Sequence, residues 1–266
     1  MLAFAISRYY FYPASRFYSL KSVSLLRKLI AYISVSCLVI LITSFSWLPA
    51  TNEQTLAASN GVSHLISDSA QDISAKASSL YDLLCLEEKG LSKEAFDHAY
   101  KGYQRLLGKN LINCPDYLTI CDFSQSAKQK RLYLIDIANN KIVLNTYVAH
   151  GRNSGGEYAT RFSNKPSSLQ SSLGFYVTKN TYNGEHGLSL KVEGLEPGFN
   201  DRAYRRAIVV HGATYIGEGS MGRSYGCPAI PKNESNTIIN TIKNGTCLFI
   251  YHPSTRYLQG SKILKG

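Results

Sequence analysis

A histidine and a cysteine lie sixteen residues apart in the stretch VVHGATYIGEGSMGRSYGCPAIP, which runs from residue 209 to residue 231. A thiolate is a strong nucleophile, but a free thiol titrates at about 8.5 and needs a base at neutral pH. His211 can be that base, and later a general acid, if it comes within hydrogen-bond reach of Cys227. The pair therefore indicates nucleophilic attack on a carbonyl.

The residues before the cysteine fit the same chemistry. Gly226 lets the backbone approach a substrate closely, and the amides from Tyr225 to Cys227 could face a developing oxyanion. The interpretation competes with two plainer ones, a structural cysteine and a hydrogen-bonded histidine. A zinc site would also need His150 and His186, but no two of these ligands have the close spacing of a paired set. We predict no metal and no cofactor.

Strands and helices that could position this pair are visible around it. The segment AIVVHG predicts a short buried strand that ends at His211, and RLYLIDI and KIVLNTYVAHG flank an Asn-containing turn as a β-hairpin would. Further expected elements are strands at 174–184, 188–195 and 246–253, and a helix within 231–245. The fold class is therefore mainly β.

The chain before this β body reads as helical. Residues 75–107 have apolar residues at helical spacing, with Ser92 as a plausible N-cap. We expect the following organisation: a basic cytoplasmic tail at 1–28, a transmembrane or signal anchor at 29–48, a linker at 49–75, a helical region at 76–123 and a catalytic domain at 124–266.

The expected anchor has no charge over twenty residues, Leu29 to Leu48. At about 1.5 Å per residue it would span a hydrocarbon core of about 30 Å. Five basic and no acidic residues lie before Glu53, which favours a cytoplasmic N-terminus and places the residues after about 50 outside the membrane. Cleavage of a signal peptide is the rival interpretation.

The remaining bulk properties exclude little. The formal charge of +11 suits an anionic polymer or surface, but no nucleic-acid motif is present, so we expect no nucleic-acid partner. The sequence does not set the oligomeric state. Beyond the anchor, Cys85, Cys114 and Cys121 could pair in more than one way, whereas Cys247 lies in an apolar run typical of a buried thiol.

Several motifs together resemble one family. VVHGA followed by GRSYGCPA resembles the active-site signature of YkuD-type L,D-transpeptidases, and VAHGRNSG, GEHGLSLKVEGLEPGFND and RAIVVHGA resemble the murein L,D-transpeptidase catalytic domain family. The similarity extends from about Leu91 to Tyr251. It implies an L,D-transpeptidase-like β-sandwich that acts on peptidoglycan stem peptides. Together with the expected anchor, it implies a bacterial inner membrane with the catalytic domain in the periplasm, or secretion to the periplasm if the N-terminal segment is cleaved.

The resemblance also implies roles for residues. Cys227 would attack the carbonyl of the L-centre of diaminopimelate in a tetrapeptide, release D-alanine and form a thioester that an amine resolves. His211 would be the base, oriented by the carbonyl of Gly212, and Ser224, Tyr225 and Gly226 would form the oxyanion loop. Carbapenems would acylate the same cysteine.

One position departs from the family pattern, which usually has Arg or Asn two residues after the cysteine. Here that residue is Ala229, and Arg223 could supply the missing polar group. Other candidate substrate contacts, for which hydrogen bonding within loops is the equal alternative, are Arg152, Ser154, Arg161 and Asn164.

Three alternative functions remain open at this stage. Hydrolysis of the thioester would make the protein an L,D-carboxypeptidase, and loss of chemistry would leave an inactive peptidoglycan-binding module. A sortase-type enzyme also uses His, Cys and Arg, but with a much longer His–Cys spacing and an arginine after the cysteine. The sequence has neither feature.

Overall fold

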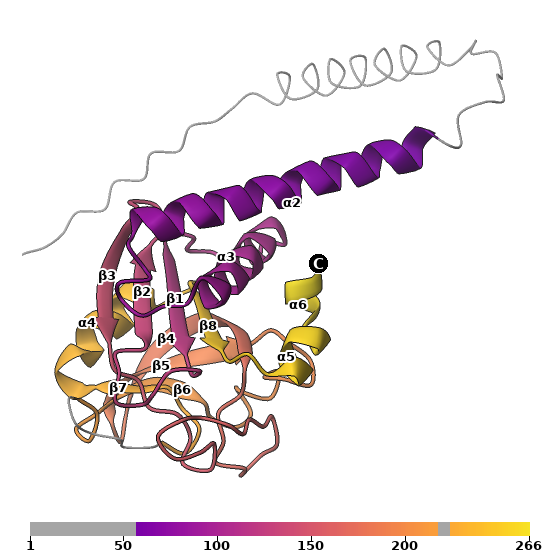
Figure 1. Ribbon diagram of the computed structural model, residues 1–266. Helices are drawn as coiled ribbons and strands as arrows, with labels where there is room; N and C mark the ends of the chain where they lie inside the picture. The colour runs from indigo at the N-terminus through magenta and orange to yellow at the C-terminus, as the bar shows by residue number, and fades with distance from the viewer. Residues whose placement is uncertain (1–56, 218–223) are drawn as a thin grey trace, which may run out of the picture. The chain divides into compact units, whose positions relative to one another are not determined.

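The computed structural model describes residues 57–217 and 224–266, with side chains from residue 70 onward (Figure 1). The expected tail and anchor therefore lie outside the described residues. Within those two ranges, no helix combines the length and the apolar character needed to cross a membrane.

Eight strands form one sheet. They are β1 (Tyr117–Asp122), β2 (Leu132–Asp136), β3 (Lys141–Thr146), β4 (Gly174–Gly184), β5 (Gly187–Gly194), β6 (Val209–Ala213), β7 (Ala229–Pro231) and β8 (Cys247–Tyr251). Their order is β3-β2-β1-β8-β4-β5-β6-β7, with parallel pairing at β1–β8 and β6–β7 and antiparallel pairing elsewhere.

The two outer strands of this order are joined after β3 ends. Ala149 forms an antiparallel bridge with Ala229 of β7, and its amide donates to the Ala229 carbonyl at 2.8 Å. The sheet is therefore barrel-like. The β-sandwich predicted from the family resemblance is corrected: one continuous mixed sheet replaces two stacked sheets, because β1–β8 and β8–β4 pairing joins the halves.

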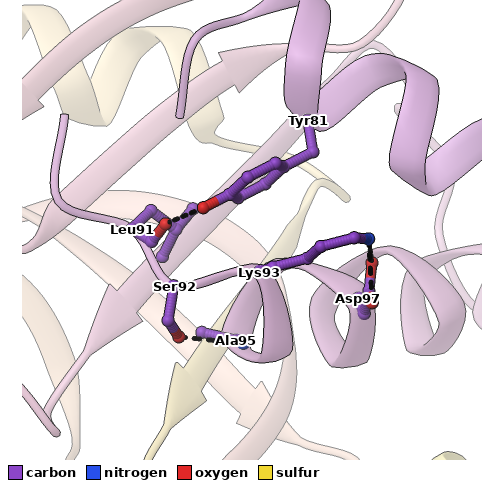
Figure 2. Close-up of polar contacts among 6 residues, drawn as sticks. All are labelled: Tyr81, Leu91, Ser92, Lys93, Ala95 and Asp97. Atoms are coloured by element: carbon purple, nitrogen blue, oxygen red, sulfur yellow. Dashed lines mark hydrogen bonds and ion pairs between the residues drawn. The ribbon is translucent and has the colours of Figure 1, made fainter. Parts of the chain in front are cut away.

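From residue 57 onward, two helices precede the sheet, α2 (Ala57–Leu83) and α3 (Lys93–Gly108). Figure 2 shows their connection, where the Tyr81 hydroxyl donates to the Leu91 carbonyl at 2.7 Å. Ser92 is the N-cap of α3, as predicted, because its Oγ accepts from the Ala95 amide. Lys93 adds an ion pair with Asp97 one turn on.

The helix α3 packs on β1 and β8, and its apolar residues enter the core between helix and sheet. Phe96 is fully buried in this core, which also contains the stacked rings of Phe175 and Phe249 with centroids 4.1 Å apart. Helix α4 (Lys232–Ile242) packs on β5, β6 and β7, and the short helices α5 (Thr255–Gly260) and α6 (Lys262–Lys265) end the chain. The helices thus support the strands that carry the candidate site.

The structure confirms the predicted β2–β3 hairpin, a strand at His211 and the last strand. The strand β6 continues past His211 to Ala213, so the predicted strand end at His211 is wrong, and two further boundaries are corrected. Residues 57–75, expected in a linker, belong to α2, and β1 lies in the region expected to be helical. All five cysteines in the described part of the chain are free thiols, and Cys247 is fully buried as predicted.

Candidate active site

His211 lies on β6, between β5 and β7. It is paired with Ser189 on one side and Ala229 on the other, so three strands fix its backbone. Its Nδ1 lies 3.2 Å from the Gly212 carbonyl oxygen, which can only accept a hydrogen bond. Nδ1 therefore carries the proton, and Nε2 keeps a lone pair that can accept one.

The residue after His211 is a glycine, Gly212, because helix α4 lies close against β6 at this position. A Cβ at Gly212 would lie 2.5 Å from Ser235 Oγ and 2.8 Å from Ser235 Cβ. A side chain here would push the helix away from the strand that carries His211. The glycine after the histidine is thus required by packing, in addition to supplying the carbonyl that orients the ring.

A second histidine stacks on the first. The ring centroids of His186 and His211 are 4.2 Å apart, with an angle of 20° between the planes. His186 comes from the β4–β5 turn, and its carbonyl accepts from Lys232 Nζ. Burial lowers the pKa of His211, and the nearby charges of His186 and Lys232 lower it further, against the opposing effect of the Gly212 carbonyl. His211 is therefore neutral at pH 7.

Cys227 lies beside the start of the same strand. The Val209 amide points at the thiol, and Sγ is 3.8 Å from the Ala207 carbonyl. The next residue, Pro228, accepts from the His211 amide at 3.4 Å. The loop that carries the thiol thus runs along β6, two residues from the imidazole on that strand.

Burial raises the pKa of the Cys227 thiol above its usual value, although the Val209 amide and Arg206 oppose this shift. Among the described residues, the recorded hydrogen-bond acceptor of the thiol is Ala207 rather than His211. At neutral pH the pair is accordingly a thiol and a neutral imidazole, not a preformed ion pair.

The loop before the cysteine is held by its own serine. Ser224 Oγ accepts from the Gly226 amide at 3.1 Å and donates to the Cys227 carbonyl. The Gly226 amide is therefore used, and the amides of Tyr225 and Cys227 bond to no described residue. Of the three amides predicted to face an oxyanion, these two are available for that purpose.

Gly226 has a backbone conformation that favours glycine, with φ of 121°. A Cβ there would lie 2.8 Å from the Gln170 carbonyl oxygen. The glycine before the cysteine therefore permits both the backbone angle and the close approach of the neighbouring loop.

The segment after β3 supports this loop from the other side. The Ser224 amide donates to the His150 carbonyl at 3.0 Å, and the Arg152 amide donates to the Ser224 carbonyl at 2.7 Å. The Arg152 guanidinium lies 4.8 Å from the centre of the Tyr225 ring. Tyr225 is 68% exposed, so this cation–π pair forms an accessible surface next to the thiol.

The departure at Ala229 has a structural explanation. Ala229 is fully buried on β7, and its side chain belongs to a small apolar cluster with Ala149, Ala213 and Ile216. Arg223, which was predicted to compensate, lies outside the described residues. The side chain at Ala229 faces this cluster instead of the thiol.

Arg206 is a cation close enough to the thiol to affect its pKa, and it was not among the predicted site residues. Its Nη1 donates to the Ser163 carbonyl at 2.7 Å, and its Nη2 donates to the Gln170 carbonyl at 2.6 Å, the same oxygen that faces Gly226. A basic residue just before the predicted strand was the available signal. Its partners lie about forty residues earlier, so spacing alone could not reveal them.

The other predicted contacts divide between loop structure and surface. Ser154 is fully buried, and its Oγ accepts from the Ser171 amide at 2.9 Å. Arg161 is exposed on the same loop. Asn164 donates to Asp201 at 2.7 Å and lines a separate cavity. The structure thus brings only Arg152 of this set to the cysteine loop.

The remaining histidine of the hypothetical metal set supports the cysteine loop through its carbonyl, while its side chain contacts an arginine. His150 is buried, and its Nδ1 is 2.8 Å from Nη2 of the buried Arg131. In the ranges 57–217 and 224–266, no three His, Cys, Asp or Glu side chains converge on a common point.

A thiol just before β7 and a neutral imidazole in the neighbouring strand β6, next to two available amides, can carry out nucleophilic attack on a carbonyl. The barrel-like sheet with a thiol beside a histidine is the arrangement of a cysteine-dependent acyl-transfer enzyme. Residues 87–251 match the sequence profile of the L,D-transpeptidase catalytic domain. The chain belongs to this L,D-transpeptidase family.

Solved structures resemble the chain at low identity. An L,D-transpeptidase from Mycobacterium smegmatis is 11% identical, covers 52% of this chain and 59% of its own, and has a TM-score of 0.33. An L,D-transpeptidase from Xylanimonas cellulosilytica is 14% identical, and the match covers 68% of this chain and 93% of that protein, with a TM-score of 0.31. An L,D-transpeptidase from Stackebrandtia nassauensis is 12% identical, and the match covers 81% of this chain and 88% of that protein, with a TM-score of 0.31. The chain spans less than two thirds of the first of these proteins, and no curated protein sequence matches it.

Proposed function

We propose that the protein is a peptidoglycan L,D-transpeptidase with Cys227 as nucleophile and His211 as general base. The observation that carries the proposal is the placement of both residues along β6. Pro228, next to the cysteine, bonds to the His211 amide, and the imidazole is oriented by Gly212 so that Nε2 can accept a proton.

The first half-reaction begins with a protonated thiol, because burial raises the pKa of Cys227 and lowers that of His211. As Sγ attacks the carbonyl carbon of the diaminopimelate L-centre, its proton passes to Nε2 of His211. The carbonyl oxygen becomes an oxyanion, which the amides of Tyr225 and Cys227 stabilise.

Collapse of the intermediate breaks the peptide bond to D-alanine. The proton on His211 passes to the leaving amine, and a thioester remains on Cys227. An acceptor amine then attacks the thioester, loses a proton to His211 and restores the thiol. In the described structure the thiol donates a hydrogen bond to the Ala207 carbonyl. Sγ must therefore turn toward the imidazole when the substrate binds.

The test uses the full chain with a disaccharide tetrapeptide, with and without a free D-amino acid, and mass spectrometry of the products. Wild type is expected to release D-alanine and to form an exchanged product, and Cys227→Ala is expected to form neither. The matched control is Cys85→Ala, which removes an exposed thiol and is expected to behave as wild type.

Other outcomes change the proposal in defined ways. Tripeptide as the only product would make the protein a carboxypeptidase, because water then resolves the thioester. Equal activity of Cys227→Ala would refute the cysteine mechanism. A carbapenem gives an independent check, since it should add its mass to wild type and not to Cys227→Ala.

We also propose that residues 29–48 anchor the chain in a bacterial inner membrane with the catalytic domain in the periplasm. The support is the uncharged run of twenty residues preceded by basic residues. Alkaline phosphatase fused after Gly266 should then be active in cells. An inactive fusion that is expressed in full would contradict this topology.

A further inference from the structure

A cavity of about 350 Å³ is lined in part by Ser163, whose carbonyl accepts from Arg206. Three of its lining residues carry a positive charge: Lys165, Arg202 and Arg256. The volume is at the lower end of the range for ligand pockets. The cavity does not include Cys227, so it is distinct from the thiol site.

The positive charge of this cavity is not neutralised by neighbouring groups. None of its three cations forms an ion pair with a carboxylate in the described part of the chain. Asp201 is the one acidic residue of the lining, and its Oδ1 already accepts from Asn164 Nδ2 and from the Gly198 amide. Three positive groups thus face one carboxylate that serves the loop structure.

The rest of the lining is mixed. Phe162 and Phe199 give an apolar wall, and Thr160 and Ser254 add hydroxyl groups. A small inorganic ion would leave this wall unused. An organic anion with an aliphatic stem uses both parts, because its carboxylate can meet the cations while its carbon chain lies on the rings.

The cavity and the cysteine loop share one structural element. Ser163 lines the cavity, and its carbonyl accepts from Arg206 Nη1. Nη2 of the same guanidinium holds Gln170, whose carbonyl oxygen faces Gly226. The Arg206 guanidinium therefore connects the cavity wall to the segment that contacts the cysteine loop.

We propose that this cavity binds a free carboxylate of the peptidoglycan stem peptide while another part of the peptide lies at Cys227. The inference rests on the proposed function for the choice of ligand. The stem peptide carries several carboxylates on aliphatic carbons, which is the chemistry that the lining accommodates. Arg202 and Arg256 supply the charge, and the rings of Phe162 and Phe199 contact the stem.

The test measures binding of disaccharide tetrapeptide by calorimetry to the full chain in the Cys227→Ala background, where no turnover occurs. The test variant is the double substitution Arg202→Gln and Arg256→Gln. The matched control is Arg205→Gln, an exposed arginine of the same segment that does not line the cavity. A second ligand has its free carboxylates amidated, and inorganic phosphate is a third.

Removal of the two arginines is expected to weaken tetrapeptide binding about 10-fold or more. Arg205→Gln should leave the affinity unchanged, and the amidated peptide should bind the test variant and the control equally. In the wild-type cysteine background, the double variant should raise KM and leave kcat near its original value.

Equal tetrapeptide affinity of the double variant and Arg205→Gln would overturn the proposal. Phosphate that binds at the cavity and leaves peptide affinity unchanged would also overturn it, by assigning the cavity to phosphate. The proposed function fails separately, if wild type binds tetrapeptide and releases no D-alanine. Arginine-dependent peptide binding would still stand in that case.

Discussion

Two regions of the molecule differ in how their polar contacts are arranged, although each also has contacts of the other's range. In the α2–α3 region, Tyr81 bonds to Leu91, Ser92 caps Ala95, and Lys93 pairs with Asp97, all within ten residues along the chain (Figure 2). Around Cys227, local bonds of Ser224 are joined by contacts between distant segments. Arg206 bonds to a residue 43 positions away, and Ser171 to one 55 positions away.

From this contrast we expect that the residues that determine stability and those that determine the reaction rate lie in different regions of the chain. The α2–α3 region fixes the core with caps and apolar side chains, and none of its contacts reaches the thiol. The loops at the thiol fix a few atoms by hydrogen bonds to backbone carbonyls from several segments. We therefore expect substitutions in the first region to change the free energy of unfolding and those in the second to change the rate.

The largest expected effect is on the rate. His211→Gln removes the proton acceptor and should slow thioester formation about 10²- to 10⁴-fold with little change in stability. The measurement is the rate of carbapenem adduct formation on Cys227 by mass spectrometry. His98→Gln, a half-exposed histidine of α3, is the matched control. A rate loss below threefold for His211→Gln would remove His211 from the mechanism.

Phe96→Ala tests the other region. Phe96 is fully buried between α3 and the sheet, so its truncation should cost about 3–5 kcal/mol of unfolding free energy. The adduct rate per folded molecule should remain that of wild type. Leu111→Ala, at a side chain that is 44% exposed, is the control for denaturant unfolding. A slower adduct rate in folded Phe96→Ala would show that the two regions are coupled.

The same contrast explains what the sequence could predict. The Ser92 cap, the β2–β3 hairpin and the presence of a strand at His211 depend on neighbours in sequence, and the structure confirms them, although β6 continues to Ala213. His211, Gly212 and Cys227 were identified by motif, and the Gly212 carbonyl does face the imidazole as predicted. Their catalytic roles stay predictions.

What depends on distant segments was not predicted. The parallel β1–β8 pairing and the Ala149–Ala229 bridge close a single sheet, and no local pattern encodes either. Arg206 and His186 reach the site only once the loops around them are folded. Ser154, by contrast, was chosen for its polar loop and is buried as part of the loop's own hydrogen bonding.

Gly226→Ala should have an intermediate effect, and it should change both the free energy of unfolding and the reaction rate. The backbone there has φ of 121°, and the added Cβ would lie 2.8 Å from the Gln170 carbonyl oxygen, so the cysteine loop must shift. We expect about 1–3 kcal/mol of destabilisation and a rate loss of about 10- to 100-fold. Gly156→Ala, where a Cβ meets open space, is the control for both measurements. Unchanged rates in both variants would show that the loop position does not matter for attack.

The smallest expected effect is a shift in pH dependence. His211 must be neutral to accept the thiol proton, so the adduct rate should fall as the pH drops through its pKa, which burial, His186 and Lys232 hold below 6.5. His186→Ala removes both a neighbouring charge and part of the burial. Both changes raise the pKa of His211, so the acid limb of the profile should move to higher pH.

His186→Phe separates the two causes of that shift. Phenylalanine keeps a ring stacked on His211, where the centroids now lie 4.2 Å apart, but it carries no charge. Burial is the larger cause of the lowered pKa, so His186→Phe should move the acid limb less than His186→Ala does. Equal shifts in the two variants would mean that charge, and not the stacked ring, is what His186 contributes. An acid limb that stays in place in both variants would mean that the limb reports a group other than His211.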